Sequence, residues 1–97
     1  MTTLKLRAEA VADLREIGRY GAAEHGLDAA AAYLQRIDDA MDMLKKFPQI
    51  GMACDELRDG LRSLPVRQHH IFYRYADGHI SVVRVLHKAR DAQRWLE

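Results

Sequence analysis

Two stretches in the second half of the chain are rich in β-branched and aromatic residues, Ile71–Tyr75 and Ile80–Leu86. Asp77 and Gly78 lie between them. The tightest hairpin turns need a positive φ at both central residues, and the Asp-Gly pair satisfies this requirement well. The pattern therefore predicts a β-hairpin with a two-residue loop.

A shorter apolar run, Leu61–Val66, precedes the hairpin and contains Pro65. Proline lacks the N–H group that bonds to a neighbouring strand, so this run is expected to be short or to lie at an edge. The three runs together predict an antiparallel meander. A two-residue loop would fix the hairpin register by placing three pairs opposite one another: Tyr75 and Ile80, Tyr73 and Val82, and Ile71 and Arg84.

The first half of the chain has the spacing of two amphipathic helices. The first begins at about Glu9, ends at Gly26 and has one apolar face, which contains Val11, Leu14, Ile17, Gly18 and Gly21. The second starts near Asp28 and ends at Pro48, with an apolar stripe made of Ala30, Tyr33, Leu34, Ile37, Ala40, Met41, Leu44 and Phe47. The short link between them predicts an αα-hairpin.

Leu4 and Leu6 alternate with basic residues as in a short strand, and Asp91–Leu96 can form a final helical turn. The predicted fold is α+β, in the order β-α-α-β-β-β with a short C-terminal helix, and residues 1–97 are expected to form a single domain. Both faces of the predicted sheet are apolar, and the αα-hairpin can cover only one. The C-terminal tail, a partner protein, or both would cover the other.

The composition is that of an ordinary globular protein, with 48% hydrophobic and 30% charged residues. The sequence contains neither an apolar run of the roughly 20 residues that cross a membrane nor the apolar centre of a signal peptide. We therefore expect a cytoplasmic protein without membrane contact. Cys54 is the only cysteine, which excludes a disulfide framework.

The net charge of +1 conceals an asymmetry between the two halves. Residues 1–57 contain seven Lys and Arg against ten Asp and Glu, a net −3, whereas residues 58–97 contain eight against four, a net +4. This distribution favours an anionic partner on the sheet half, either nucleic acid or an acidic protein. Scattered solvated charges on the sheet would give the same count.

Few residues suggest cofactor or metal chemistry. His69 and His70 are adjacent on a strand, so their side chains point to opposite faces and cannot easily bind one metal ion. Cys54 lies beside two carboxylates, which disfavour its thiolate. There is no glycine-rich phosphate loop, and we expect neither a metal nor a cofactor.

Basic residues gather at the end of the last strand, together with one indole. A basic rim with an exposed aromatic ring suits contact with an acidic or nucleic-acid-bearing target, and the predicted target-binding residues are His87, Lys88, Arg90, Arg94 and Trp95. Structural roles are the alternative. Trp95 and Leu96 could close the core, Arg90 could pair with Asp91 or a helix carboxylate, and Arg84 could pair with Asp91 or Glu56.

The order of several short motifs resembles the ParE branch of the RelE/ParE toxin superfamily, over nearly the whole chain. The upstream motifs are Ala12-Asp13-Leu14-x-x-Ile17, Tyr33-Leu34 and Pro48-x-Ile50-Gly51. The downstream motifs are Glu56-Leu57-Arg58-x-Gly60-Leu61-Arg62-Ser63, Ile71-Phe72-Tyr73-Arg74 and Arg84-Val85-Leu86-His87-x-x-Arg90-Asp91.

This resemblance implies the toxin of a type II toxin–antitoxin pair, with an αα-hairpin on an antiparallel sheet. ParE-type toxins act on DNA gyrase and bind a small ParD-like antitoxin. RelE-type relatives instead cleave mRNA on the ribosome, and the catalytic candidates for that alternative are Arg62, Arg84, His87 and Arg90. They form an incomplete set of acid, base and charge clamp, so we favour the gyrase-directed, non-enzymatic function. A toxin that has lost its activity is a third alternative.

The antitoxin is expected to bind the apolar surface that the fold leaves uncovered. Grooves beside four helix residues, Leu14, Ile17, Tyr33 and Leu34, would accept an amphipathic segment.

Overall fold

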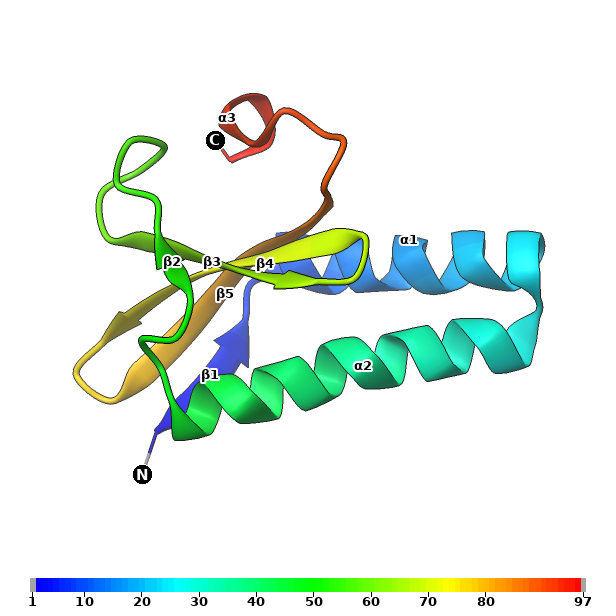
Figure 1. Cartoon of the computed structure of the whole chain (residues 1–97), viewed down its shortest axis with the longest axis horizontal. Helices are drawn as coiled ribbons and strands as arrows, with labels where there is room; N and C mark the ends of the chain where they lie inside the picture. The colour runs from blue at the N-terminus through cyan, green and yellow to red at the C-terminus, as the bar shows by residue number, and fades with distance from the viewer. Residues whose placement is uncertain (1, 97) are drawn as a thin grey trace.

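A computed structural model describes residues 2–96. Figure 1 shows an αα-hairpin packed on a twisted sheet, with a short helix at the C-terminus. The helices are α1 (Ala8–His25), α2 (Leu27–Lys46) and α3 (Ala92–Trp95). The strands are β1 (Thr3–Leu6), β2 (Met52–Ala53), β3 (Leu61–Val66), β4 (His69–Ala76) and β5 (His79–His87). The predicted α+β fold is confirmed, and β2 is an addition within the connection expected to be irregular.

The five strands lie in the order β1-β5-β4-β3-β2. The meander β3-β4-β5 is antiparallel as predicted, whereas β1 pairs with β5 in parallel, with Leu4 opposite Ile80 and Leu6 opposite Val82. β2 pairs only with Arg62 and Ser63 of β3. Pro65 therefore lies beyond the end of β2, on a stretch of edge where its missing N–H leaves no partner unsatisfied.

The β4-β5 hairpin turns at Asp77 and Gly78, whose φ angles of 52° and 77° are those the predicted turn requires. The predicted pairs Tyr75–Ile80 and Tyr73–Val82 are confirmed. The third pair is wrong. An extra residue in β5 shifts the register between Phe72 and Tyr73, so Ile71 lies opposite Val85 and Arg84 lies opposite Phe72. The bulge thereby places Val85 on the face of Tyr73 and Val82, and Leu86 on the face of Phe72.

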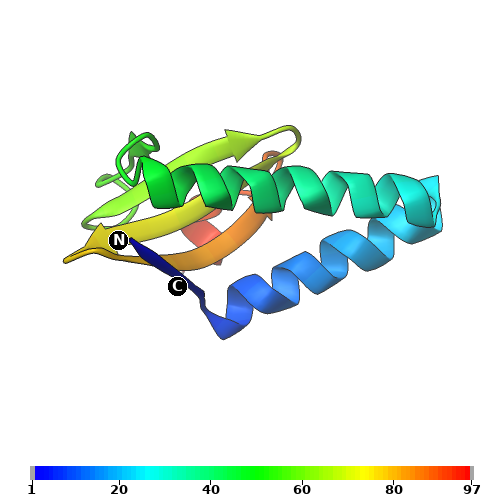
Figure 2. The same ribbon diagram turned by 90° about the horizontal axis from the view of Figure 1, so that it is seen from below.

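The two long helices begin and end close to the predicted positions. Gly26 separates them with a φ of 92°, a conformation that favours glycine, and α2 ends two residues before Pro48. The hairpin extends past the sheet, as Figures 1 and 2 show. No helix among residues 2–96 is long and apolar enough to span a membrane.

The first core lies between the αα-hairpin and the sheet. Ala10 of α1 is fully buried in it, and its large buried side chains come from α2, β4 and β5 and include Ile37, Leu44, Ile71, Tyr73, Ile80, Val82 and Val85. At about 1.5–3 kcal/mol for each fully buried large side chain, this layer is the main source of fold stability.

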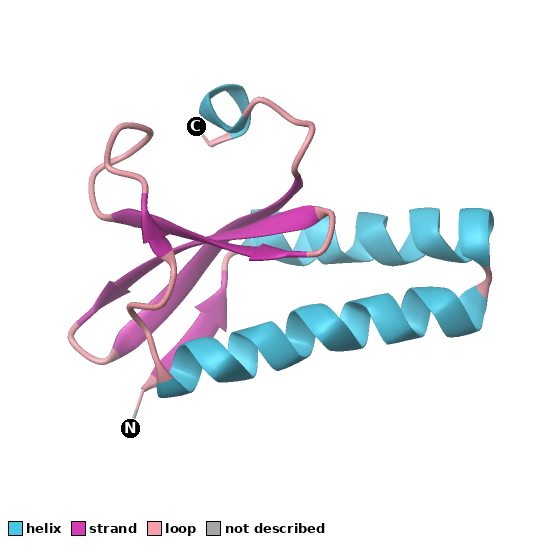
Figure 3. Cartoon of the chain, viewed as in Figure 1, coloured by secondary structure: helices cyan, strands magenta, loops and turns pink. Residues whose placement is uncertain are grey.

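The second face of the sheet is covered by the chain itself. Phe72 and Leu86 pack there against Cys54, Leu61 and Leu96. Figure 3 shows the loop after β2 and the helix α3 on this side of the sheet, opposite the two long helices. The C-terminal tail was one of the two candidates expected to cover this face, and it does so together with the loop after β2.

Candidate functional site

A groove of about 770 Å³ lies where the αα-hairpin passes the ends of β4 and β5. Its helix side is made by Ile17 and Gly21 of α1 and by Ala29, Ala30 and Tyr33 of α2. His69, Val85, His87 and Arg90 line its sheet side. The groove thus joins two of the predicted antitoxin contacts, Ile17 and Tyr33, to two of the predicted target contacts, His87 and Arg90.

Tyr33 ties α2 to the sheet inside this groove. Its hydroxyl lies 2.6 Å from Nδ1 of His69 and accepts a hydrogen bond of 3.1 Å from the backbone N–H of Gln68. The His69 ring then meets His87 edge to face, with centroids 5.2 Å apart. Nδ1 of His87 accepts the backbone N–H of Ala89 at 3.0 Å. These contacts hold the turn before β4 and the end of β5 against the hairpin.

The pKa of His69 is lowered to about 4, chiefly by partial burial and in addition by the neighbouring His87 and Arg90. His69 is therefore neutral at pH 7. In a neutral ring, Nδ1 can accept a hydrogen bond from the Tyr33 hydroxyl. The groove wall consequently carries no charge at this position.

The other two predicted antitoxin contacts lie elsewhere. Leu14 and Leu34 line a second, more open groove between the two helices, of about 710 Å³, together with Leu6, Val11 and Met41. The four helix residues predicted to lie beside antitoxin-binding grooves therefore divide into two pairs. Ile17 and Tyr33 line the groove beside the sheet, whereas Leu14 and Leu34 line the groove between the helices.

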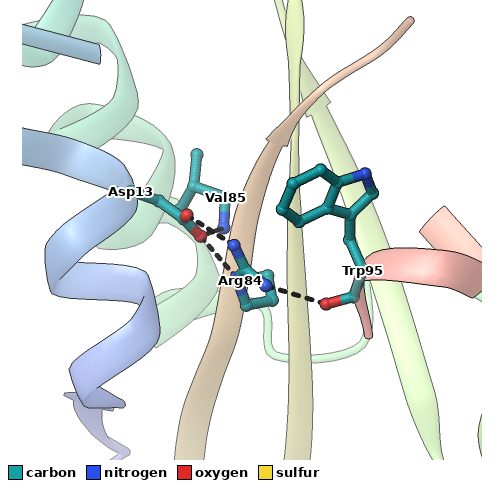
Figure 4. A network of polar contacts seen from close by, with 4 residues as sticks. All are labelled: Asp13, Arg84, Val85 and Trp95. Carbon is teal, nitrogen blue, oxygen red and sulfur yellow. Dashed lines mark hydrogen bonds and ion pairs between the residues drawn. The ribbon is translucent and has the colours of Figure 1, made fainter. Parts of the chain in front are cut away.

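Arg84 pairs with a residue of α1 that the sequence reasoning missed. Its Nε and one terminal nitrogen each lie 2.8 Å from the Asp13 carboxylate, and the other terminal nitrogen donates to the backbone carbonyl of Trp95 at 2.7 Å (Figure 4). Asp13 also accepts the N–H of Val85 at 2.9 Å. The hydrogen bond with Asp13 raises the pKa of Arg84 above its usual range. The suggested pairing of Arg84 with Asp91 or Glu56 is wrong.

Arg62 is also engaged within the chain. One of its terminal nitrogens donates to the carbonyls of Gly51, at 2.8 Å, and Gln49, at 3.2 Å. The Tyr73 hydroxyl donates to the carbonyl of Pro48 at 2.7 Å and accepts the N–H of Gly51 at 2.9 Å. Arg62 and Tyr73 therefore anchor the loop between α2 and β2.

The C-terminal residues divide between core and surface. Leu96 is 5% exposed and completes the second core, whereas Trp95 is 42% exposed. The guanidinium of Arg90 stacks over the Trp95 ring at 4.4 Å, and Arg84 lies 5.9 Å from it. Arg90 forms no ion pair with any residue between 2 and 96, so the suggested pairing with Asp91 or a helix carboxylate is wrong. Lys88 and Arg94 lie on the exposed surface nearby.

The His, Cys, Asp and Glu side chains of residues 2–96 include no group of three or more that could hold a metal ion. His69 and His70 do not act together: His69 faces Tyr33, whereas the His70 ring lies 6.0 Å from that of Phe72 on the other face. Cys54 is buried, with its thiol 3.3 Å from the Ser63 hydroxyl.

A family model described as ParE toxin of type II toxin–antitoxin system, parDE, matches residues 4–92. The chain belongs to the ParE toxin family. The matched range includes most of β1, both long helices and the whole meander, which are the elements that form the groove and the Asp13–Arg84 ion pair.

Two relatives within this family are similar along most of their length. The chain is 42% identical over 90 residues to toxin ParE1 of Mycobacterium tuberculosis, covering 92% of each chain. It is 30% identical over 93 residues to toxin ParE1 of Caulobacter vibrioides, covering 96% of each. The solved structure described as the chromosomal ParDE TA system from P. aeruginosa has a similar fold, with a TM-score of 0.79 at 22% identity, covering 90% of this chain and 96% of that one.

The geometry gives physical reasons for several motifs of this ParE-family chain. Gly51 must be glycine because a Cβ there would lie 2.5 Å from the Tyr73 hydroxyl oxygen. Asp13 lines the groove and holds Arg84, and the sequence indicated neither role. Its motif was recognised, but a partner 71 residues away leaves no signal in the local pattern.

Proposed function

We propose that this toxin inhibits bacterial growth by poisoning DNA gyrase and is neutralised by a ParD-like antitoxin. It acts in the cytoplasm as a binding protein and has no nuclease activity of its own. Family membership supports a toxin of a toxin–antitoxin pair. The hydrogen bonds that occupy Arg62 and Arg84 within the chain support a binding protein over a nuclease.

The observation that carries the proposal is that Arg62 and Arg84 are both bound to groups of the chain itself. A nuclease of the RelE type would need cationic side chains free to clamp a phosphate while a base and an acid act on it. Arg62 is bound to backbone carbonyls, and Arg84 is bound to Asp13 and Trp95. Arg62 also lies on β3 and Arg84 on β5, with β4 between them. Of the four catalytic candidates, only His87 and Arg90 remain available.

The target-binding surface is the basic rim of His87, Lys88, Arg90, Arg94 and Trp95. Arg90 and Trp95 form its centre, because they stack on each other while the indole remains partly exposed. A stacked Arg–Trp pair is typical of the anchors that dominate protein interfaces. The surrounding cations would increase the rate of association with an acidic surface of gyrase.

A ParD-like partner is supported by the fold relative, which is described as a ParDE system. The two grooves supply its binding surface, with Ile17 and Tyr33 in one and Leu14 and Leu34 in the other. Apolar grooves beside a helix pair accept an amphipathic segment whose apolar residues repeat at helical spacing.

Expression of the toxin alone in bacteria tests the proposal. Gyrase poisoning predicts filamentous cells and induction of the DNA-damage response, while protein synthesis continues at first. Both effects should disappear when the antitoxin encoded beside the toxin gene is expressed as well. Rapid loss of protein synthesis with fragmented mRNA would contradict the gyrase target, and harmless expression would indicate an inactive toxin.

A further inference from the structure

An exposed apolar surface lies between the last turns of α2 and strand β2, away from both grooves and from the basic rim. Of the seven large apolar side chains that are exposed within residues 2–96, four fall in this segment: Met43, Phe47, Ile50 and Met52. None of the four lines either groove. We propose that this surface, the 43–52 patch, binds the same patch of a second copy of the chain, so that two toxins form a symmetric dimer.

The patch is held in one conformation by groups beneath it. The hydroxyl of the buried Tyr73 bonds to backbone groups at both ends of residues 48–51, and Arg62 donates to two carbonyls of the same stretch. The N–H of Ile50 donates to the carbonyl of Phe47 at 3.1 Å. A loop fixed in this way loses little conformational freedom when it binds, which favours association.

The charges on the two sides of the patch have opposite signs. On the side of α2, residues 42–46 contain two lysines against one aspartate, and on the side of the loop after β2, residues 55–59 contain three carboxylates against one arginine. Figure 1 shows the patch between these two charged ends. A two-fold axis through the patch therefore brings the basic end of each copy beside the acidic end of the other, and a symmetric interface needs this self-complementarity. A partner surface of a single sign would be repelled at one end.

The backbone of β2 supplies the position of the two-fold axis. β2 is the last strand of the sheet, so its outer edge has no neighbour among the described strands. The N–H of Cys54 donates to the carbonyl of Leu61, and because bonding direction alternates along an antiparallel strand, the N–H and C=O of Ala53 point away from β3. Two exposed Ala53 residues placed opposite each other would exchange these hydrogen bonds. The dimer thereby closes an edge that would otherwise be open to unspecific pairing.

Sedimentation equilibrium of the purified toxin, without antitoxin or gyrase, tests the proposal. The wild type should show a reversible monomer–dimer equilibrium. Met52→Glu introduces a carboxylate that meets its own copy near the two-fold axis, and we expect it to raise the dissociation constant of the dimer at least about 10-fold. The matched control is Leu27→Glu, which makes a comparable exchange at an exposed apolar position at the other end of α2 and should change the constant less than about 2-fold.

A charge exchange tests the two-fold arrangement itself. Lys46 and Glu56 lie at opposite ends of the patch, and neither forms an ion pair with any residue of the described range 2–96. Lys46→Glu and Glu56→Lys should each weaken the dimer, because each places like charges next to one another across the interface. The double variant exchanges the two signs in both copies and should recover most of the wild-type affinity.

Three results would overturn the proposal. The first is a wild-type toxin that stays monomeric as its concentration rises, and the second is an equal effect of Met52→Glu and Leu27→Glu on the dimer. The third is a monomeric toxin whose binding to gyrase or antitoxin is weakened by Met52→Glu alone, since the patch would then belong to that partner. Self-association is measured on the toxin alone, so its outcome does not depend on the proposed gyrase target.

Discussion

The ion pair between Asp13 and Arg84 holds α1, β5 and the C-terminal segment together, and its loss should be costly. Asp13→Ala removes three acceptor contacts at once, two to the guanidinium and one to the N–H of Val85. It leaves the cation of Arg84 in a position where its side chain is only 16% exposed. The remaining hydrogen bond to the Trp95 carbonyl cannot neutralise that charge.

The magnitude follows from the burial of both partners. Removing one member of a buried ion pair typically destabilises a protein by about 3–5 kcal/mol. Because both side chains keep slight contact with solvent, we expect the lower end, about 3 kcal/mol. For a domain of this size, such a loss lowers the melting temperature by roughly 12–24 °C. Glu16→Ala is the control on the same helix, since its pair with Arg19 is exposed and should contribute less than about 1 kcal/mol.

Urea unfolding of the wild type, Asp13→Ala, Arg84→Met and the double variant gives the coupling between the two residues. We expect a coupling of about 2 kcal/mol, because methionine keeps much of the arginine's packing and the double variant leaves no unpaired charge. The reasoning is refuted if Asp13→Ala costs no more than Glu16→Ala. A coupling near zero would likewise show that the pair behaves as a surface ion pair.

Three further predictions concern other contacts. Gly51→Ala should destabilise the fold by about 1–3 kcal/mol in urea unfolding, because its new Cβ meets the buried Tyr73 hydroxyl; an unchanged stability would contradict this close packing. Since the pKa of His69 is about 4 in the folded protein and 6.5 in the unfolded chain, the unfolded state binds more protons between these values. The free energy of unfolding should therefore rise from pH 4 to pH 6.5, and this rise should be absent in the His69→Gln variant. An equal pH dependence of stability in both proteins would contradict the lowered pKa of His69. Leu96→Ala should cost about 2–4 kcal/mol by opening the second core, whereas Trp95→Ala should cost less than about 1 kcal/mol yet reduce growth arrest; the reverse order would place the indole in the core.

Local patterns predicted the elements of this fold well, for physical reasons that act over a few residues. The Asp77-Gly78 turn and the runs of β-branched and aromatic residues on both sides of it predicted the hairpin, and helical spacing with Gly26 predicted the αα-hairpin. The same patterns could not predict the bulge in β5. Val82, Val83 and Val85 are all apolar, so either register buries apolar side chains on both faces and alternation cannot choose between them.

Contacts between distant parts of the chain were beyond the sequence pattern. Nothing local indicates that β1 joins β5 in parallel or that Asp13 finds Arg84. The basic cluster and the apolar helix residues were recognised as candidates, but only the fold brings Ile17 and Tyr33 beside His87 and Arg90. It also separates them from Leu14 and Leu34. Some residues of the candidate site could therefore be named from the sequence, whereas the role of Asp13 and the arrangement of these residues around two grooves could not.

A supercoiling assay with purified gyrase and purified toxin tests the central claim most directly. We predict that the toxin abolishes supercoiling in a dose-dependent manner and that an equimolar amount of the antitoxin restores it. The Arg90→Ala variant should require at least a 5-fold higher concentration for the same inhibition. Full gyrase activity at saturating wild-type toxin, together with cleavage of mRNA on ribosomes by the same preparation, would contradict the account.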